Sequence, residues 1–319
     1  MVKRILIILL CTLIMLNSFI LKTSSFSFTN SKITSLSINE NSKNIDYKTC
    51  MKQDLLILMV AYPEYITDIL YENNDVYIVM KSGKKFIYDD KKNKTPEEKL
   101  SNPDLQDMME QLYPLTKTNE IMPKDFNPGR IRHYGLLNEV YGDSKNAIEK
   151  NLCGLKYGYT NYPFNSRNGA NIALEDTLKE LISLSKENNK IGALIYPPNG
   201  TYNYRLISGT GRLSSHAYGI TIDLKSDKRD YWKWSSVEKG KSRLNEYPDE
   251  LVSAFENHNF VWGGKWGYFD ILHFEYWPEI ILKAKYFSDY TNDDQWFKGA
   301  PSEDNYVKKC IELIDSKIQ

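Results

Sequence analysis

The chain has 319 residues, which is enough for one large domain or two small ones with substantial cores. Its 41 basic and 41 acidic side chains balance, so no overall basic field favours nucleic acid as a partner. With ordinary contents of Gly and Pro and no fixed repeat, the sequence also excludes a collagen, a repeat array and a long acidic tail.

The N-terminus carries a pattern typical of export. Lys3 and Arg4 precede an apolar run over 5–21, which is the order of a basic n-region and an apolar h-region. A single membrane anchor is the alternative, because the run approaches the roughly 20 residues that a spanning helix needs. We expect an exported protein that is extracellular, in the cell wall or anchored facing outward, and both cleavage and anchoring stay open.

Three cysteines follow this segment, at positions 50, 153 and 310. An odd number at wide spacings is not a disulfide framework, and no Cys-x-x-Cys pair indicates a metal knuckle. We interpret them as scattered thiols.

After the export pattern, the first third of the chain is predicted to contain a linker and then short helices and strands. Residues 22–50 are rich in Ser, Thr, Asn and Lys, as solvated linkers are. Residues 55–70 are apolar and broken at Pro63, which predicts a short helix or a helix and a turn. Two apolar runs over 75–90 flank Ser-Gly-Lys and indicate a β-hairpin.

Three helices are expected next. One starts at Ser101, which offers an N-cap, and closes at Pro114. A second follows Ser144, and a third covers 172–189. Four apolar residues recur along one face of this third helix at helical spacing: Leu174, Leu178, Leu181 and Ile182.

In the second half, the pattern predicts an extended segment over 190–210, with a turn at 198–200, and a strand over 219–224. The remaining expected elements are a helix within 245–260, a strand-like run over 269–277 and an amphipathic helix over 302–318. Helices and short strands mix without strict βαβ alternation. We therefore predict the α+β class, with a small mixed or antiparallel sheet flanked by helices.

The chain has only four histidines: His133, His216, His258 and His273. Two of them have a carboxylate nearby, since Asp223 follows His216 by seven residues and Asp270 precedes His273 by three. Two imidazoles and one carboxylate can hold a zinc ion with one position left open, as catalytic sites do. A further carboxylate could then act as general base.

The surroundings of these residues favour a functional role over a surface position. Asp223 lies within an apolar strand, where an unpaired carboxylate is costly to bury. Asp270 and His273 lie in an aromatic run, and a regular strand would point them to opposite faces. A bulge or a turn between them would bring them together. Glu275 shares the face of His273 in a regular strand, so it is an alternative base.

Two motifs carry a resemblance to a known family. Ser-x-His-x-x-Gly-x-x-x-Asp spans Ser214 to Asp223, and Asp-x-x-His-Phe-Glu spans Asp270 to Glu275. Together they resemble the zinc D-alanyl-D-alanine carboxypeptidases (VanY-like), a group that includes bacterial and phage L-alanyl-D-glutamate endopeptidases. The resemblance covers about 160–285, and two motifs in the right order are more specific than either alone.

The resemblance implies the roles of individual residues. Zinc would bind His216, Asp223 and His273, with Asp270 as the catalytic acid and base. The family places an arginine before the first zinc histidine, where it binds the substrate carbonyl. Arg205 matches that position best.

Arg212 is the second choice for this arginine. Two departures from the family pattern stand out: Thr221 replaces a frequent alanine, and Asp270 stands where carboxypeptidase members carry Glu. Asp at that position and the Gly-Gly-x-Trp turn at 263–266 are similar to the endopeptidase-like branch. The resemblance therefore leaves the cleaved bond open.

The function implied is that of an exported bacterial zinc peptidase that cleaves the stem peptides of peptidoglycan. One alternative is a zinc-free relative that binds cell-wall peptides without cutting them. Another is a membrane-anchored interaction protein in which the N-terminal region acts. A membrane contact is expected only through the N-terminal anchor, and the sequence does not indicate an oligomeric state.

Five regions follow from this interpretation: a signal peptide or anchor at 1–25, a linker at 26–50, an accessory N-terminal region at 51–159, the catalytic domain at 160–285 and a C-terminal helical extension at 286–319. His133 and His258 match neither motif and are interpreted as structural. The aromatic run 231–234 follows Asp223 closely, so one of its rings could line the substrate groove.

Overall fold

The computed structural model describes residues 46–288 and 295–318. The chain divides into two units, Met1–Ser42 and Lys43–Gln319, and all described residues belong to the second. The predicted export signal and most of the predicted linker therefore lie outside the described residues. Within the described part, none of the helices has the length and apolar character needed to cross a membrane.

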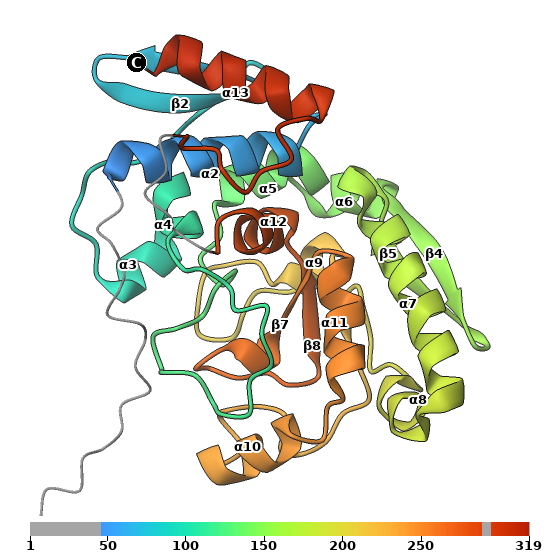
Figure 1. Cartoon of the computed structure of the whole chain (residues 1–319). Coiled ribbons are helices and arrows are strands. Elements are labelled where there is room, and N and C mark those ends of the chain that lie inside the picture. Colours follow the sequence, from blue (N-terminus) through green and yellow to red (C-terminus); the bar gives the residue numbers. More distant parts are fainter. Residues whose placement is uncertain (1–45, 289–294, 319) are drawn as a thin grey trace, which may run out of the picture. The chain divides into compact units, whose positions relative to one another are not determined.

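Small antiparallel sheets and many helices make up this unit, which confirms the predicted α+β class (Figure 1). The strands, in their order within each sheet, are β1 (Ile66–Glu72), β2 (Asp75–Met80) and β3 (Lys85–Ile87); β4 (Leu152–Tyr157) and β5 (Thr160–Asn165); and β6 (Thr221–Asp223), β8 (His273–Tyr276) and β7 (Phe260–Trp262).

The helices connect these strands and cover them. They are α2 (Tyr47–Ala61), α3 (Pro96–Ser101), α4 (Leu105–Met109), α5 (Tyr134–Tyr141), α6 (Lys145–Lys150), α7 (Ala170–Glu187), α8 (Asn189–Ile195), α9 (Ser215–Tyr218), α10 (Val237–Leu244), α11 (Asp249–Asn257), α12 (Pro278–Tyr286) and α13 (Asn305–Lys317). Two short 3-10 turns, η1 (Arg167–Gly169) and η2 (Gly263–Lys265), complete the set.

The helix α2 starts earlier than the sequence pattern suggests, and its end agrees with the predicted break at Pro63. It begins at Tyr47, within the predicted linker, and stops before Pro63. Residues 66–72 then form β1 rather than a continued helix, because β-branched side chains there pair with β2. The helix packs against α12 and α13, so the two ends of the described chain share one core (Figure 1).

The hairpin prediction is confirmed, and the helix after it is shifted. The chain reverses between β2 and β3 at Gly83, which has a positive φ of 87°. The predicted N-cap at Ser101 is wrong, since Ser101 ends α3. Instead Asp104 caps α4, with its side chain on the amide of Asp107 and the Asp107 carboxylate returning to the Asp104 amide.

The long helix α7 matches the prediction, whereas the segment after it does not. Leu174, Leu178 and Leu181 are buried as expected, but Ile182 lies 43% exposed at the edge of the apolar face. Residues 189–195, which were predicted to be extended, form α8 with Asn188 as its N-cap. Seven residues are too few for a helical period to stand out in the sequence.

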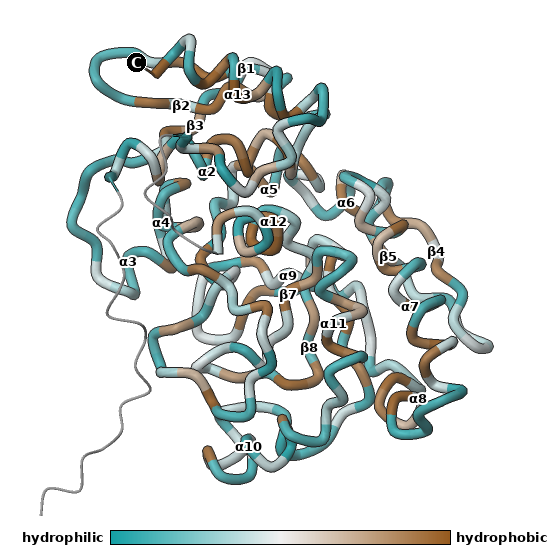
Figure 2. The backbone as a smooth tube through the Cα atoms, in the orientation of Figure 1, coloured by the Kyte–Doolittle hydropathy of each residue, from teal (hydrophilic) through white to brown (hydrophobic). Residues whose placement is uncertain are grey.

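The sheet β6–β8–β7 is the floor of the site described next. Phe274 of β8 stacks on Phe255 of α11 with ring centroids 3.9 Å apart, and Phe260 of β7 packs edge-on against Phe255. All three rings are fully buried. Hydrophobic residues are concentrated on α12 and near β8, while loops around α3 and α10 are mostly hydrophilic (Figure 2). The floor is therefore rigid, as a precise site requires.

Candidate metal centre

Three of the residues singled out in the sequence meet at the β6–β8 pair. One ligand atom from each of His216, Asp223 and His273 lies within 4.8 Å of the others. Asp223 and His273 come together because they are direct partners in the antiparallel register of β6 and β8. The pairing joins two motifs that lie fifty residues apart in the sequence.

The first motif has a local structural reason for each of its fixed residues. Ser214 caps the short helix α9, with its hydroxyl near the His216 amide. Gly219 ends α9 with a φ of 69°, so that the chain can turn directly into β6. A Cβ at Gly219 would also lie 2.6 Å from Leu152. The spacing from His216 to Asp223 is thus one helical turn, one glycine and one short strand.

The facing atoms of the three side chains form a compact donor set. His216 Nε2 lies 3.2 Å from Asp223 Oδ2, and His273 Nδ1 lies 2.7 Å from Asp223 Oδ1. The outer nitrogen of His216, Nδ1, lies 2.5 Å from the carbonyl oxygen of Thr201. The carbonyl accepts a hydrogen bond from the Nδ1–H group of His216. The Nε2 atom therefore carries the free lone pair, on the side of Asp223. Two imidazole nitrogens and one carboxylate suit a borderline cation such as zinc.

Glu275 lies behind His273 rather than beside the open face of the group. Its Oε1 lies 2.6 Å from His273 Nε2, the nitrogen that faces away from Asp223. The carboxylate also accepts hydrogen bonds from Arg132, Ser215 and Trp277, and it is only 1% exposed. Its oxygens are thus fully engaged. Glu275 is placed to orient the His273 ring, and it is not placed to take a proton from water.

The charges around Glu275 explain how a carboxylate remains ionised at this depth. Burial would raise the pKa of Glu275, but the positive charge of Arg132 and the hydrogen bonds from His273 and Ser215 hold it well below its usual range. The Arg132 Nη2 atom lies 2.6 Å from Glu275 Oε2, and both side chains are buried. A residue 143 positions earlier in the chain therefore stabilises the group behind a candidate metal ligand.

Asp270 reaches the group through the turn that the sequence argument required. Residues 271–272 form a turn, and the His273 amide donates to the Asp270 carbonyl at 3.1 Å. Gly263 approaches the Asp270 carbonyl so closely that a Cβ there would lie 2.4 Å away. The pKa of the Asp270 carboxyl is raised to about 6, mainly by burial. The charge of His273 acts to lower this pKa, and the negative charge of Asp223 acts to raise it. A carboxyl with this pKa is suited to general base catalysis near neutral pH.

The two arginines proposed from the sequence line a cleft of about 690 Å³. Tyr231 also lines this cleft and pairs with Asp270 in an isolated β-bridge, which places the cleft beside the metal group. Arg205 is exposed, and its guanidinium forms no hydrogen bond or ion pair with the described residues; its carbonyl accepts from the Ser214 amide at 3.1 Å. Arg212 donates from Nη1 to the Leu100 carbonyl at 3.0 Å. Tyr231 and Trp232 of the aromatic run line the same cleft.

A third arginine in this cleft was missed at the level of sequence. Arg130 donates from Nη1 to the Tyr268 carbonyl at 3.1 Å, and its guanidinium lies 5.1 Å from the centre of the Trp266 ring. It also interacts electrostatically with Asp270. It lies directly after Pro128 and Gly129, in the loop between α4 and α5. The one sequence feature that could have indicated a role for Arg130 is the alternation of Arg130 and Arg132 around an apolar residue.

The remaining histidines are structural, as interpreted. His133 Nδ1 accepts a hydrogen bond from the Leu136 amide and caps α5, and its ring packs edge-on against Phe86. His258 pairs with Glu180 at 3.2 Å on the side of α7. The three cysteines after the N-terminal segment are free, which confirms the interpretation as scattered thiols.

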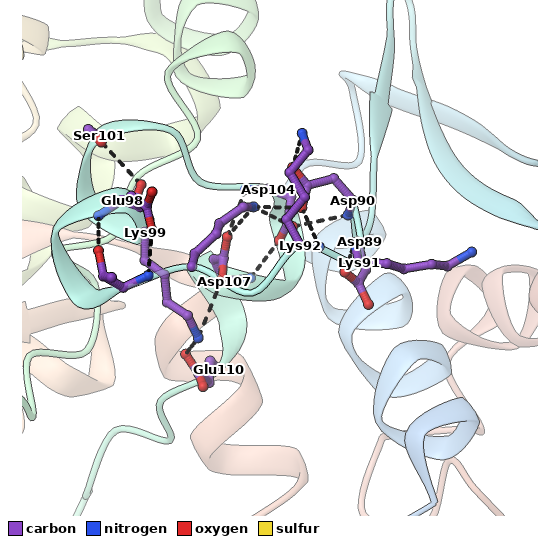
Figure 3. Close-up of polar contacts among 12 residues, drawn as sticks. Asp89, Asp90, Lys91, Lys92, Glu98, Lys99, Ser101, Asp104, Asp107 and Glu110 are labelled. Carbon is purple, nitrogen blue, oxygen red and sulfur yellow. Dashed lines mark hydrogen bonds and ion pairs between the residues drawn. The ribbon is translucent and has the colours of Figure 1, made fainter.

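A second cluster, formed by Asp89, Asp90 and Asp104, also has the spacing of a cation site. Here the positive charge comes from the chain itself (Figure 3). Lys94 Nζ lies 3.0 Å from Asp90, 2.7 Å from Asp104 and 2.6 Å from Asp107. We interpret this cluster as an internal ion-pair network.

Comparison with known families agrees with the geometry. Residues 208–276 match the family of D-alanyl-D-alanine carboxypeptidases. The match contains His216, Asp223, Asp270 and His273, so it confirms the resemblance drawn from the two motifs. Searches among curated proteins and among solved structures found no match to the chain. A carboxypeptidase family segment with three grouped metal ligands makes the chain a candidate metallopeptidase.

Proposed function

We propose that the chain is an exported zinc peptidase that cleaves peptidoglycan stem peptides, as a D-alanyl-D-alanine carboxypeptidase or an L-alanyl-D-glutamate endopeptidase. The observation that carries the proposal is the meeting of His216, Asp223 and His273 beside Asp270, within the segment that matches the carboxypeptidase family. Export rests on the N-terminal pattern alone, and contact with a membrane is proposed only through that segment.

The donor set favours zinc as the cation. His216 Nε2, one Asp223 oxygen and His273 Nδ1 would hold it, while Thr201 and Glu275 fix the two rings from behind. Zinc in such a site acidifies water and polarises the carbonyl of the scissile bond.

The remaining steps belong to side chains of the protein. Asp270 takes the proton from the attacking water and passes it to the nitrogen of the leaving amine, so the C–N bond breaks and one water is consumed. Its raised pKa, about 6, allows both directions of transfer. Arg205 stabilises the negative charge that develops on the carbonyl oxygen, from its place along the cleft.

The test is incubation of the zinc-loaded full chain with defined stem peptides, followed by mass spectrometry. Loss of a terminal D-Ala identifies a carboxypeptidase, and a cut after L-Ala identifies an endopeptidase. His216→Ala should abolish cleavage, whereas His258→Ala, a histidine paired with Glu180 outside the site, should not. Binding of the peptides without any cleavage would instead support the non-catalytic relative, and the enzyme proposal would be wrong.

A further inference from the structure

The cleft beside the metal group is built from two separated parts of the chain. One wall comes from the family segment and includes Arg212, Tyr231 and Tyr268. The other comes from residues 94–131, ahead of the segment that matches the family. The N-terminal region therefore takes part in the substrate cleft and is not merely packed behind it.

The cationic side chains that line the cleft form two groups, those with a carboxylate partner and those without one. In the first group, Lys94 lies 2.7 Å from Asp104 and 2.6 Å from Asp107. Lys99 lies 2.6 Å from Glu110, a pair that can be followed in Figure 3. These lysines have carboxylate partners already. They shape the wall and are not available to a ligand.

The arginines of the cleft belong to the second group, because they have no carboxylate partner in the part of the chain that the structure describes. Four cations of the lining form no ion pair with a carboxylate of the described residues: Arg130, Arg205, Arg212 and Lys233. Two exposed acidic groups of the lining, Glu97 and Asp125, are also outside any ion pair. The cleft therefore keeps an excess of positive charge, which favours an anionic group on the bound molecule.

Arg130 is the best-positioned of these cations. Its guanidinium lies over the Trp266 ring at 5.1 Å and the Tyr268 ring at 6.0 Å, and one N–H is fixed on the Tyr268 carbonyl. Its other N–H groups make no hydrogen bond to the described residues. Tyr268 precedes Asp270 by only two residues, and Trp266 lies 5.8 Å from the His273 ring. A rigid, half-buried fork of donors is thus held next to the reacting groups.

We propose that Arg130 binds a carboxylate of the substrate next to the scissile bond. A guanidinium fork pairs with a carboxylate through two parallel hydrogen bonds, and the aromatic rings preset its orientation. The inference rests on the proposed peptidase function and adds that the substrate must carry a carboxylate close to the bond that is cut. The carboxylate belongs either to the C-terminal residue or to an acidic residue within the peptide.

The experiment compares matched peptides on the zinc-loaded full chain. One peptide has free carboxylates, the second has an amidated C-terminus, and the third has an amidated internal side chain. Amidation of the recognised carboxylate should lower kcat/KM of the wild type about 100-fold, because a site built for a charged partner rejects its neutral analogue. Whichever amide causes the loss identifies the source of the carboxylate.

The variant arm assigns the effect to Arg130. Arg130→Gln should lower kcat/KM about 100-fold for the free peptide and leave the rate for the affected amide unchanged within about two-fold. Arg130→Lys should lie between, since it keeps the charge and loses the fork. Arg167→Gln, an exposed arginine outside this cleft, is the matched control and should behave as wild type.

Two outcomes would overturn the inference. Equal loss on free and amidated peptides in Arg130→Gln would indicate a structural role, as would a lower unfolding midpoint with the same selectivity as wild type. Equal rates on all three peptides in the wild type would exclude carboxylate recognition. If no peptide is cleaved at all, the proposed function fails, and binding of the same peptides to Asp270→Asn still decides whether Arg130 selects the free carboxylate.

Discussion

Two places in the described part of this chain bring three potential metal ligands together, and they differ in what surrounds the ligands. Around Asp90 and Asp104 the chain supplies Lys94, whose ammonium group lies within 3.0 Å of both carboxylates. Around Asp223 the neighbours are two imidazoles, held from behind by Thr201 and Glu275.

The difference shows that proximity of ligand atoms is a weak criterion for a metal site. A lysine between carboxylates replaces a cation and makes an ion-pair network. Imidazoles whose outer nitrogens are bound to other groups present fixed lone pairs to a common point. The second arrangement is the one that lies within the carboxypeptidase family segment.

The largest effect is expected for Asp270→Asn, which removes the base and leaves the three ligands in place. We expect kcat to fall about 100- to 10,000-fold, with unchanged zinc content by elemental analysis. A variant with full activity would move the base role to another residue, and a variant without zinc would make Asp270 part of the metal shell.

The pH profile of the wild type sharpens the same point. Burial raises the pKa of Asp270 to about 6, and a bound cation lowers it again. The base is ionised above its pKa, so kcat/KM should be level at pH 7 and fall about tenfold per pH unit on an acid limb at or below pH 6. An acid limb centred above pH 7 would assign the profile to another group.

The acidic cluster predicts a loss of stability rather than of activity. Lys94→Met leaves Asp104 and Asp107 buried with their main counter-charge removed, which should cost about 3–5 kcal/mol in urea unfolding. Lys92→Met is the matched control, since Lys92 is exposed and pairs only with Asp90, and it should cost at most about 1 kcal/mol.

Zinc content should be the same in both lysine variants. Equal stability losses would mean that Lys94 is not the counter-charge of the cluster. Loss of zinc in Lys94→Met alone would mean that the cluster and the metal centre are coupled.

A smaller effect on the metal is expected for Glu275→Gln, because Glu275 contacts His273 from behind and is not itself a ligand. Zinc affinity should fall about 10- to 100-fold in competition with a chelator. Glu279→Gln is the matched control: Glu279 is equally buried, but its partner is the Tyr62 hydroxyl, away from the metal group. Unchanged zinc affinity in Glu275→Gln would mean that Glu275 serves as the partner of Arg132 and does not support the metal ligand.

The sequence predicted the local parts of the site well. The distance from His216 to Asp223 is set by one turn of α9, Gly219 and β6, all within ten residues, so a motif can encode it. The spacing of Asp270 and His273 likewise indicated that a bulge or a turn must lie between them, and the structure has a turn there. The register that places His273 opposite Asp223 follows from strand pairing and was not predicted; the family resemblance implied only that the two residues share a metal.

Contacts between residues that lie far apart in the sequence could not be predicted from local motifs. Arg132 reaches Glu275 across 143 positions, and Arg130 reaches Tyr268 across 138. No periodicity links such pairs. The strand β7, with three residues, and the helix α8, with seven, are too short for a pattern to outweigh their neighbours. The predicted boundary between an accessory region and a catalytic domain near residue 160 stays a prediction.

The measurement that tests the account most directly is the zinc content of the purified chain and two single variants. The account predicts about one zinc per wild-type chain, almost none in His216→Ala and the wild-type amount in Asp104→Asn. Zinc retained by His216→Ala, or lost from Asp104→Asn, would contradict the assignment of the metal centre to His216, Asp223 and His273.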